Sequence, residues 1–144
     1  MKYKNLIIYG GTSEISYHLI KLYYEECEKF IIFCTNKDNF LNSFKNEKFE
    51  IDKNKFDIFE INLLEINQNL DIINKLGSEN SGIFWVAGMT GDAKQEYINI
   101  IDAKKNLEIN FTHPTLILNE LSKKMIKKSN SFIAVVTSVA GLRG

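Results

Sequence analysis

Short apolar runs of strand length recur along this chain, and they limit its possible folds more than any other feature. Residues 6–9, 30–34, 83–87 and 132–137 are almost wholly apolar, as strands are when a sheet is covered on both faces. Residues 56–61 alternate between apolar and polar side chains, which is typical of a half-exposed strand at a sheet edge. The pattern therefore predicts five strands.

Segments with helical spacing of apolar residues lie between these runs, at residues 15–26, 38–46, 66–76 and 101–128. Strands that alternate with helices pair in parallel through right-handed crossovers. We therefore expect an α/β, Rossmann-like fold, in which a doubly wound parallel sheet of strand order 3-2-1-4-5 lies between two helical layers. Asp92 and Gln95 have the spacing of a capping box.

The composition indicates one globular domain with a small partner. The chain has 144 residues, and 44% of them are apolar, which suffices for a single domain with its own core. Eighteen basic and eighteen acidic residues cancel without a long run of either sign, so we expect no nucleic-acid partner. No apolar run approaches the length of a signal-peptide core or the about 18 residues of a membrane span.

The two cysteines, Cys27 and Cys34, form neither a Cys-x-x-Cys pair nor a cluster with histidines. This spacing argues against a zinc site and against a disulfide framework. We expect no metal and a reducing cytoplasmic location.

Residues 6–16 predict a strand, a turn with two glycines and the start of a helix. Such a turn directs unpaired backbone N–H groups and the positive end of the helix dipole to one point, which suits a phosphate. Gly10 is expected to let the chain turn, and Gly11 to let the backbone approach a ligand. Glu14 and Ser16 occupy positions where a dinucleotide-binding turn often has glycine. Taken alone, the stretch fits a nucleotide site or an ordinary turn.

Five segments in the same order and spacing resemble the short-chain dehydrogenase/reductase family, and the similarity runs along the whole chain. They are the glycine turn at residues 10–16, Asn62 and Leu63 at an adenine-contact position, residues 86–88 at an Asn-Asn-Ala-Gly motif, the mid-helix Asn110, and Ser138 in residues 138–141. A narrower similarity, carried by residues 10–15, 88–92 and 108–112, is to the ketoreductase subunit of decaprenylphosphoryl-ribose epimerisation.

The resemblance implies an oxidoreductase that acts on a small-molecule carbonyl or alcohol, with a sugar or lipid-linked sugar as a candidate. Ser138 would hydrogen-bond the substrate oxygen, and the Asn110 backbone carbonyl would hold a water of the proton relay. The same family implies a homo-oligomer that packs through its long helix. The implied cofactor-binding residues are Gly10, Gly11, Thr12, Ser13, Glu14, Ile15, Thr35, Asn36, Lys37, Asn62, Leu63, Val86, Ala87 and Gly88.

The choice between NADP and NAD depends on residues 35–37, which follow the second strand. An acid there would accept a hydrogen bond from the ribose 2′-hydroxyl of NAD, whereas a cation accommodates the 2′-phosphate of NADP. Thr35, Asn36 and Lys37 supply no acid and one cation, so we expect NADP, with NAD as the alternative.

The family's Tyr-x-x-x-Lys motif does not follow Ser138 within the 144 residues. Tyr17 and Lys21 have the same spacing, but they lie in the first predicted helix, where nothing brings them to Ser138. We therefore expect the amino-terminal, single-domain part of a longer reductase, inactive alone. The alternative is a non-catalytic nucleotide-binding or interaction protein that ends at residue 144.

Overall fold

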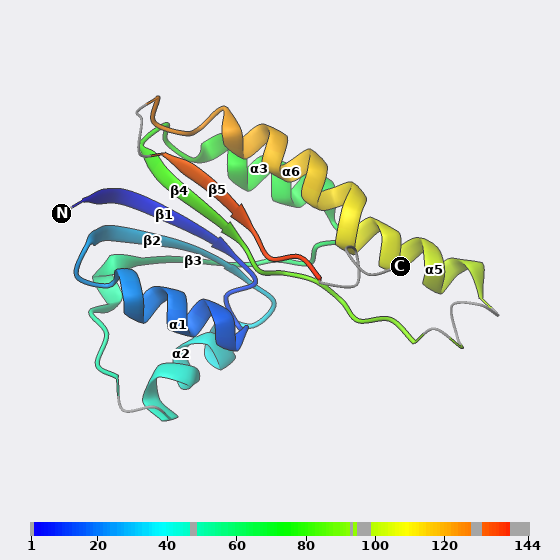
Figure 1. Ribbon diagram of the computed structural model, residues 1–144, viewed down its shortest axis with the longest axis horizontal. Helices are drawn as coiled ribbons and strands as arrows, with labels where there is room; N and C mark the ends of the chain where they lie inside the picture. The colour runs from blue at the N-terminus through cyan, green and yellow to red at the C-terminus, as the bar shows by residue number, and fades with distance from the viewer. Residues whose placement is uncertain (1, 47–48, 93, 95–98, 128–130, 139–144) are drawn as a thin grey trace.

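The computed structural model describes residues 2–46, 49–92, 94, 99–127 and 131–138. Its five strands form one parallel sheet in the order β3-β2-β1-β4-β5 (Figure 1). This order confirms the predicted α/β, Rossmann-like topology, with β3 at an edge of the sheet. The strands are β1 (Tyr3–Tyr9), β2 (Cys27–Cys34), β3 (Phe56–Glu60), β4 (Asn80–Trp85) and β5 (Phe132–Val135).

Three strands, β1, β2 and β4, begin before the apolar runs that predict them. β2 starts at Cys27, where it pairs with Tyr3 of β1, and β4 starts at Asn80, opposite Asn5. Polar residues occupy the amino ends of these strands, so hydrophobicity alone places their starts too late. Backbone pairing of β1 with β2 and β4 extends the strands past the apolar runs.

Helices cover both faces of the sheet, as Figure 1 shows: α1 and α2 lie on one face, and α3 and α6 on the other. The described helices are α1 (Glu14–Tyr23), α2 (Lys37–Asn46), the short 3₁₀ helix η1 (Lys53–Lys55), α3 (Ile66–Lys75), α5 (Ile100–Leu107), the π-helical turn η2 (Glu108–Thr112) and α6 (His113–Ser122). The expected capping box includes Gln95, which lies outside the described residues.

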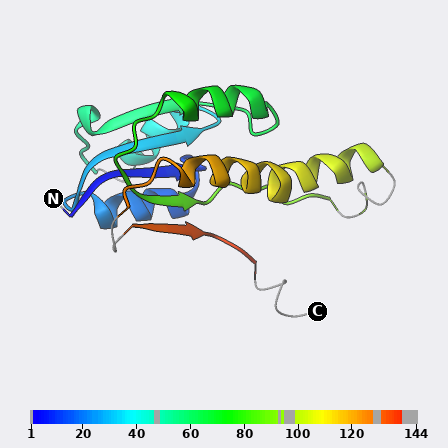
Figure 2. The same cartoon turned by 90° about the horizontal axis from the view of Figure 1, so that it is seen from above.

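The long predicted helix is continuous from α5 through η2 to α6, but it ends at Ser122. Its amino-terminal part, α5, projects past the sheet in both Figure 1 and Figure 2, and none of its residues is buried. The buried contacts of this long helix therefore come from α6.

Alternate residues of the central strands enter two separate hydrophobic cores, because successive strand side chains point to opposite faces. Leu6 and Ile8 pack in the core beneath α1 and α2, whereas Ile7 and Tyr9 pack in the core beneath α3 and α6. All four residues have no exposed surface, which agrees with β1 being the central strand.

Four aromatic rings stack across the sheet near the carboxyl ends of the strands. Phe59, Phe33, Tyr9 and Trp85 come from β3, β2, β1 and β4, and successive ring centroids lie 5.4, 4.1 and 4.6 Å apart. Burial raises the pKa of the Tyr9 hydroxyl, which has no hydrogen-bond partner among the described residues. This aromatic row gives the carboxyl edge of the sheet a rigid, apolar base.

Both cysteines are free and buried. Burial raises the pKa of the Cys27 thiol to about 11, and it also raises that of the Cys34 thiol. Each therefore stays a neutral thiol at physiological pH and packs as a small apolar side chain.

The amino end of β4 is held by Asn80, a fully buried polar residue. Its Nδ2 group donates to the carbonyl oxygens of Gly77 and Lys124, both at 2.8 Å, and its own carbonyl accepts from the Ile126 N–H at 2.8 Å. Asn5 Nδ2 donates to its side-chain oxygen at 3.3 Å. Asn80 thus joins the segments that follow α3 and α6 to the sheet.

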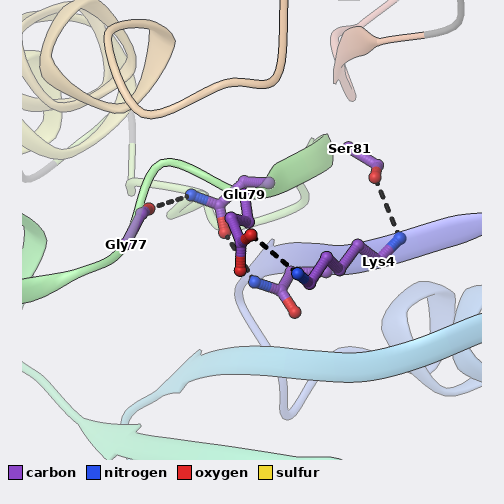
Figure 3. Close-up of polar contacts among 6 residues, drawn as sticks. Lys4, Gly77, Glu79 and Ser81 are labelled. Carbon is purple, nitrogen blue, oxygen red and sulfur yellow. Dashed lines mark hydrogen bonds and ion pairs between the residues drawn. The ribbon is translucent and has the colours of Figure 1, made fainter.

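Figure 3 shows the contacts of Lys4 with Glu79 and Ser81. The Lys4 N–H donates to Ser81 Oγ at 3.0 Å, and the Lys4 ammonium lies 2.7 Å from a carboxylate oxygen of Glu79. The register of β1 and β4 shifts just beyond Lys4, so Ser81 supplies a side-chain acceptor where the strand pairing is irregular.

Candidate functional site

The carboxyl ends of the five strands meet at one edge of the sheet, with β1 and β4 at the point where the strand order reverses. Open α/β sheets bind ligands at this point. The Val86 N–H donates to the Tyr9 carbonyl at 2.8 Å, and the Val136 N–H donates to that of Trp85 at 2.9 Å. The exits of β1, β4 and β5 are therefore directly connected, as the predicted topology requires.

Gly10 is the residue at which the chain leaves β1, and its φ of 93° lies in the left-handed region. A Cβ atom at this position would lie 2.6 Å from the Ala87 nitrogen and 2.9 Å from the Ala87 Cα. Both the backbone angle and the close approach to the β4 exit thus require glycine. This agrees with the turn that the sequence predicts for Gly10.

Gly11 is buried, and a Cβ on it would lie 2.4 Å from Ile32 Cγ2 and 3.3 Å from the Cβ of Cys34. The sequence predicts that Gly11 lets a ligand approach the backbone, but the structure shows a different need for glycine here. The missing side chain lets the turn pack closely on β2.

Three groups shape the start of α1. Ser13 caps the helix, since its Oγ accepts from the Ile15 N–H at 3.2 Å. The buried Ser16 donates from Oγ to the Gly10 carbonyl at 2.8 Å, a bond that fixes the turn. The Glu14 side chain is 90% exposed and lies 3.9 Å from His18 Nε2. It therefore extends into solvent.

The backbone of this turn retains hydrogen-bonding capacity for a ligand. Within the described residues, the N–H groups of Thr12 and Glu14 make no hydrogen bond. They lie at the amino terminus of α1, where the helix dipole favours an anion. The turn therefore has the donors that a phosphate site needs, although two of the usual glycines are replaced.

The segment after β2, residues 35–37, is exposed at the same edge. Asn36 Oδ1 accepts from the Asn39 N–H at 2.7 Å, so this side chain caps α2. Lys37 is the first residue of α2 and forms no ion pair with any carboxylate in the part of the chain that is described. A cation is thus available beside the end of β2.

The loop after β3 is held on several sides. Asn62 Oδ1 accepts from the Leu64 N–H at 3.0 Å, and the Asn62 carbonyl accepts from Asn69 Nδ2 at 2.9 Å. The Leu63 carbonyl lies 2.7 Å from Nδ1 of the buried His113. Neither Asn69 nor His113 was expected from the sequence to support this loop, because neither residue belongs to a motif and the partner of His113 is 50 positions away.

Asn110 lies in η2, the π-helical turn that interrupts the long helix. Its side chain pairs with the Met89 backbone in both directions: the Met89 N–H donates to Oδ1 and Nδ2 donates to the Met89 carbonyl, each at 2.8 Å. A Cβ on Gly88 would lie 3.2 Å from Asn110 Oδ1. Pro114 lacks the N–H that would serve the Asn110 carbonyl in a regular α-helix.

A cavity of about 540 Å³ lies between the exits of β4 and β5 and the long helix. It brings Ser138, Asn110 and residues 86–88 together, although they are far apart in the sequence. Residues 35–37 and 62–63 do not line it; they follow β2 and β3, toward the other side of the sheet. The lining residues are Trp85, Val86, Ala87, Gly88, Met89, Thr90, Asn110, Pro114, Val135, Val136, Thr137 and Ser138.

Trp85 and Tyr17 lie in different places relative to this cavity. Trp85 is both a wall of the cavity and a buried member of the aromatic row, and its Nε1 donates to the Ala87 carbonyl at 2.8 Å. Tyr17 is buried in the core beneath α1 and α2, on the face opposite α6, so it does not reach Ser138. Residues 139–141 of the expected serine segment lie outside the described residues.

The same fold occurs in solved structures that include a short-chain dehydrogenase/reductase and two proteins with NADP or NADPH bound. The structure superposes on ElxO with NADP bound at a TM-score of 0.77 and 19% identity, covering 99% of this chain and 58% of that one. It matches a short-chain dehydrogenase/reductase (glucose/ribitol dehydrogenase) from Brucella melitensis at a TM-score of 0.76 and 16% identity, covering 100% and 62%. BdcA in complex with NADPH matches at a TM-score of 0.74 and 18% identity, covering 98% of this chain and 54% of that one.

These similarities establish the fold, and the chain spans between 54% and 62% of the length of these three proteins. No protein-family model matches the sequence, and neither does any curated protein. Among the helices in the described part of the chain, none is long and apolar enough to cross a membrane.

Proposed function

We propose that this chain binds NADP and forms the nucleotide-binding part of an oxidoreductase of the short-chain dehydrogenase/reductase type. The observation that carries the proposal is the cavity in which Asn110, Ser138 and residues 86–88 meet beside the turn at Gly10. Two of the solved neighbours hold NADP or NADPH, which supports the same assignment.

In this proposal, the cofactor lies along the carboxyl edge of the sheet. The N–H groups of Thr12 and Glu14 bind its pyrophosphate, and Lys37 binds the 2′-phosphate. The remaining contacts come from the other residues of the turn, from Thr35 and Asn36, from Asn62 and Leu63 at the adenine end, and from Val86, Ala87 and Gly88 at the nicotinamide end. When bound, the cofactor supplies or accepts a hydride.

The catalytic residues of the chain are then Ser138 and Asn110. Ser138 donates a hydrogen bond to the oxygen of a carbonyl or alcohol substrate, for which a sugar or lipid-linked sugar is the candidate, as in the ketoreductase of decaprenylphosphoryl-ribose epimerisation. The Asn110 carbonyl, which has no Pro114 N–H to accept from, holds a water of the proton relay. The proton donor, a Tyr-x-x-x-Lys pair, comes from a segment outside these 144 residues.

We further propose that the full-length protein is a cytoplasmic homo-oligomer. The long helix carries five exposed large apolar side chains, with exposed fractions between 49% and 81%: Ile100, Ile101, Leu107, Phe111 and Leu116. A second copy of the helix would cover them. Light scattering on the full-length protein tests this; a stable monomer with these side chains intact contradicts it.

Fluorescence titration with NADPH and NADH tests the cofactor. We expect tighter binding of NADPH, and we expect Lys37→Ala to weaken NADPH binding about tenfold while NADH binding stays unchanged, because a charge-assisted contact to phosphate is lost. Lys75→Ala is the matched control, since this exposed lysine lies in the last turn of α3. Tighter binding of NADH, or an equal effect of the two substitutions, contradicts the role of Lys37.

A further inference from the structure

His113 is a buried histidine that connects two parts of the candidate site. It is the first residue of α6 and has only 8% of its surface exposed. Its Nδ1 lies 2.7 Å from the carbonyl oxygen of Leu63, which is 50 positions earlier in the chain. A carbonyl oxygen can only accept, so Nδ1 carries the hydrogen and donates it.

The π turn directs two nearby side chains to different loops. Asn110 pairs with Met89 after β4, whereas His113 holds Leu63 after β3, and β2 and β1 separate these two strands in the sheet. In a regular α-helix, residues three apart lie on the same face. The extra residue of a π turn rotates the positions on its two sides relative to each other. One helical turn therefore supports the loops at both ends of the proposed cofactor site.

Hydrogen bonds also orient the backbone of the loop after β3. The Asn62 carbonyl faces α3, since it accepts from Asn69 Nδ2. The Leu63 N–H belongs to the same trans peptide and so points the opposite way. Within the described residues this N–H makes no hydrogen bond. The next peptide joins Leu63 to Leu64 and is fixed at both of its polar groups. His113 Nδ1 donates to the Leu63 carbonyl, and the Leu64 N–H donates to Asn62 Oδ1.

We propose that His113 is a positioning residue for the adenine half of the cofactor. Asn69 fixes the peptide that contains the Leu63 N–H, and His113 fixes the peptide that follows Leu63. Held from both sides, the Leu63 N–H stays directed away from α3 as a donor for the adenine base, and His113 does not touch the cofactor itself. This inference rests on the proposed function. It predicts that loss of the His113 hydrogen bond weakens binding of the adenine half alone.

Two half-ligands and a pair of substitutions test this role by titration of the 144-residue chain. Adenosine 2′,5′-bisphosphate carries the adenine half, and reduced nicotinamide mononucleotide lacks it. His113→Leu removes the donor, and we expect it to weaken binding of the bisphosphate about tenfold while the affinity for the mononucleotide stays within about twofold. His113→Asn keeps a donor near the position of Nδ1, and we expect it to restore most of the affinity for the bisphosphate.

Circular dichroism melting of each variant identifies a general structural effect. Equal weakening for both half-ligands, or an Asn variant as weak as the Leu variant, overturns the proposal. If His113→Leu does not fold, His113→Gln takes its place in the comparison with His113→Asn. The Gln amide lies near the position of Nε2 and not of Nδ1, so we expect this variant to lose affinity for the bisphosphate selectively as well. Failure of the unsubstituted chain to bind either half-ligand instead overturns the proposed function, and this inference with it.

Discussion

Replacement of Gly10 by alanine is expected to lower the free energy of unfolding by about 3 kcal/mol and to abolish detectable NADPH binding. The alanine must adopt a φ of 93°, which strains any residue with a Cβ. Its Cβ must also displace the Ala87 backbone, whose nitrogen would lie only 2.6 Å away. Backbone atoms cannot move aside as a flexible side chain can, so the turn and the β4 exit must separate.

Urea denaturation and NADPH titration measure the two effects, and Gly77→Ala is the matched control. A Cβ on Gly77 meets nothing within 4 Å, so this substitution is expected to change the unfolding free energy by less than about 0.5 kcal/mol. If Gly10→Ala unfolds at the same urea concentration as the Gly77 variant, the close approach of β1 and β4 at Gly10 does not constrain the fold.

The strand order could be predicted because apolar periodicity reports burial directly. Three of the four apolar runs became the interior strands β1, β2 and β4, and the alternating run became β3 at one edge. The fourth apolar run became β5 at the other edge, where its residues alternate between half-buried and exposed. The first residues of the strands were harder to predict, because the amino ends of β2 and β4 depend on pairing with β1 and not on hydrophobicity. The shift of register at Ser81 has no counterpart in the sequence pattern.

The candidate site was predictable where local sequence determines local geometry. A strand followed by Gly10 and a helix start predicts the turn, and the family resemblance singles out Asn110 in the long helix, where the structure has η2. Contacts between distant segments carried no such signal. The bond from His113 to Leu63 spans 50 positions, and both residues have ordinary roles in most proteins, so only the fold brings them together.

Replacement of Asn80 by leucine is expected to lower the unfolding free energy by about 3 kcal/mol. Leucine has a similar size but no donor, so the carbonyls of Gly77 and Lys124 lose their 2.8 Å hydrogen bonds from a site with no exposed surface. An intramolecular hydrogen bond contributes about 0.5–1.5 kcal/mol net, and three are lost here, because Asn5 Nδ2 also loses its acceptor on Asn80. Thermal or urea unfolding measures the loss, and Asn74→Leu, at an exposed position of α3, is the control with little expected effect.

The effect of Asn80→Leu on ligand binding separates stability from function in this fold. Asn80 lies at the amino end of β4, whereas the candidate site lies at the carboxyl end. Under conditions where the variant remains folded, NADPH affinity is therefore expected to match that of the unsubstituted chain, in contrast to Gly10→Ala. Asn80 joins β4 to the segment after α6. A parallel loss of affinity would mean that a shift of this segment moves the long helix and so displaces η2 and Asn110. The two ends of the sheet would then act as one unit.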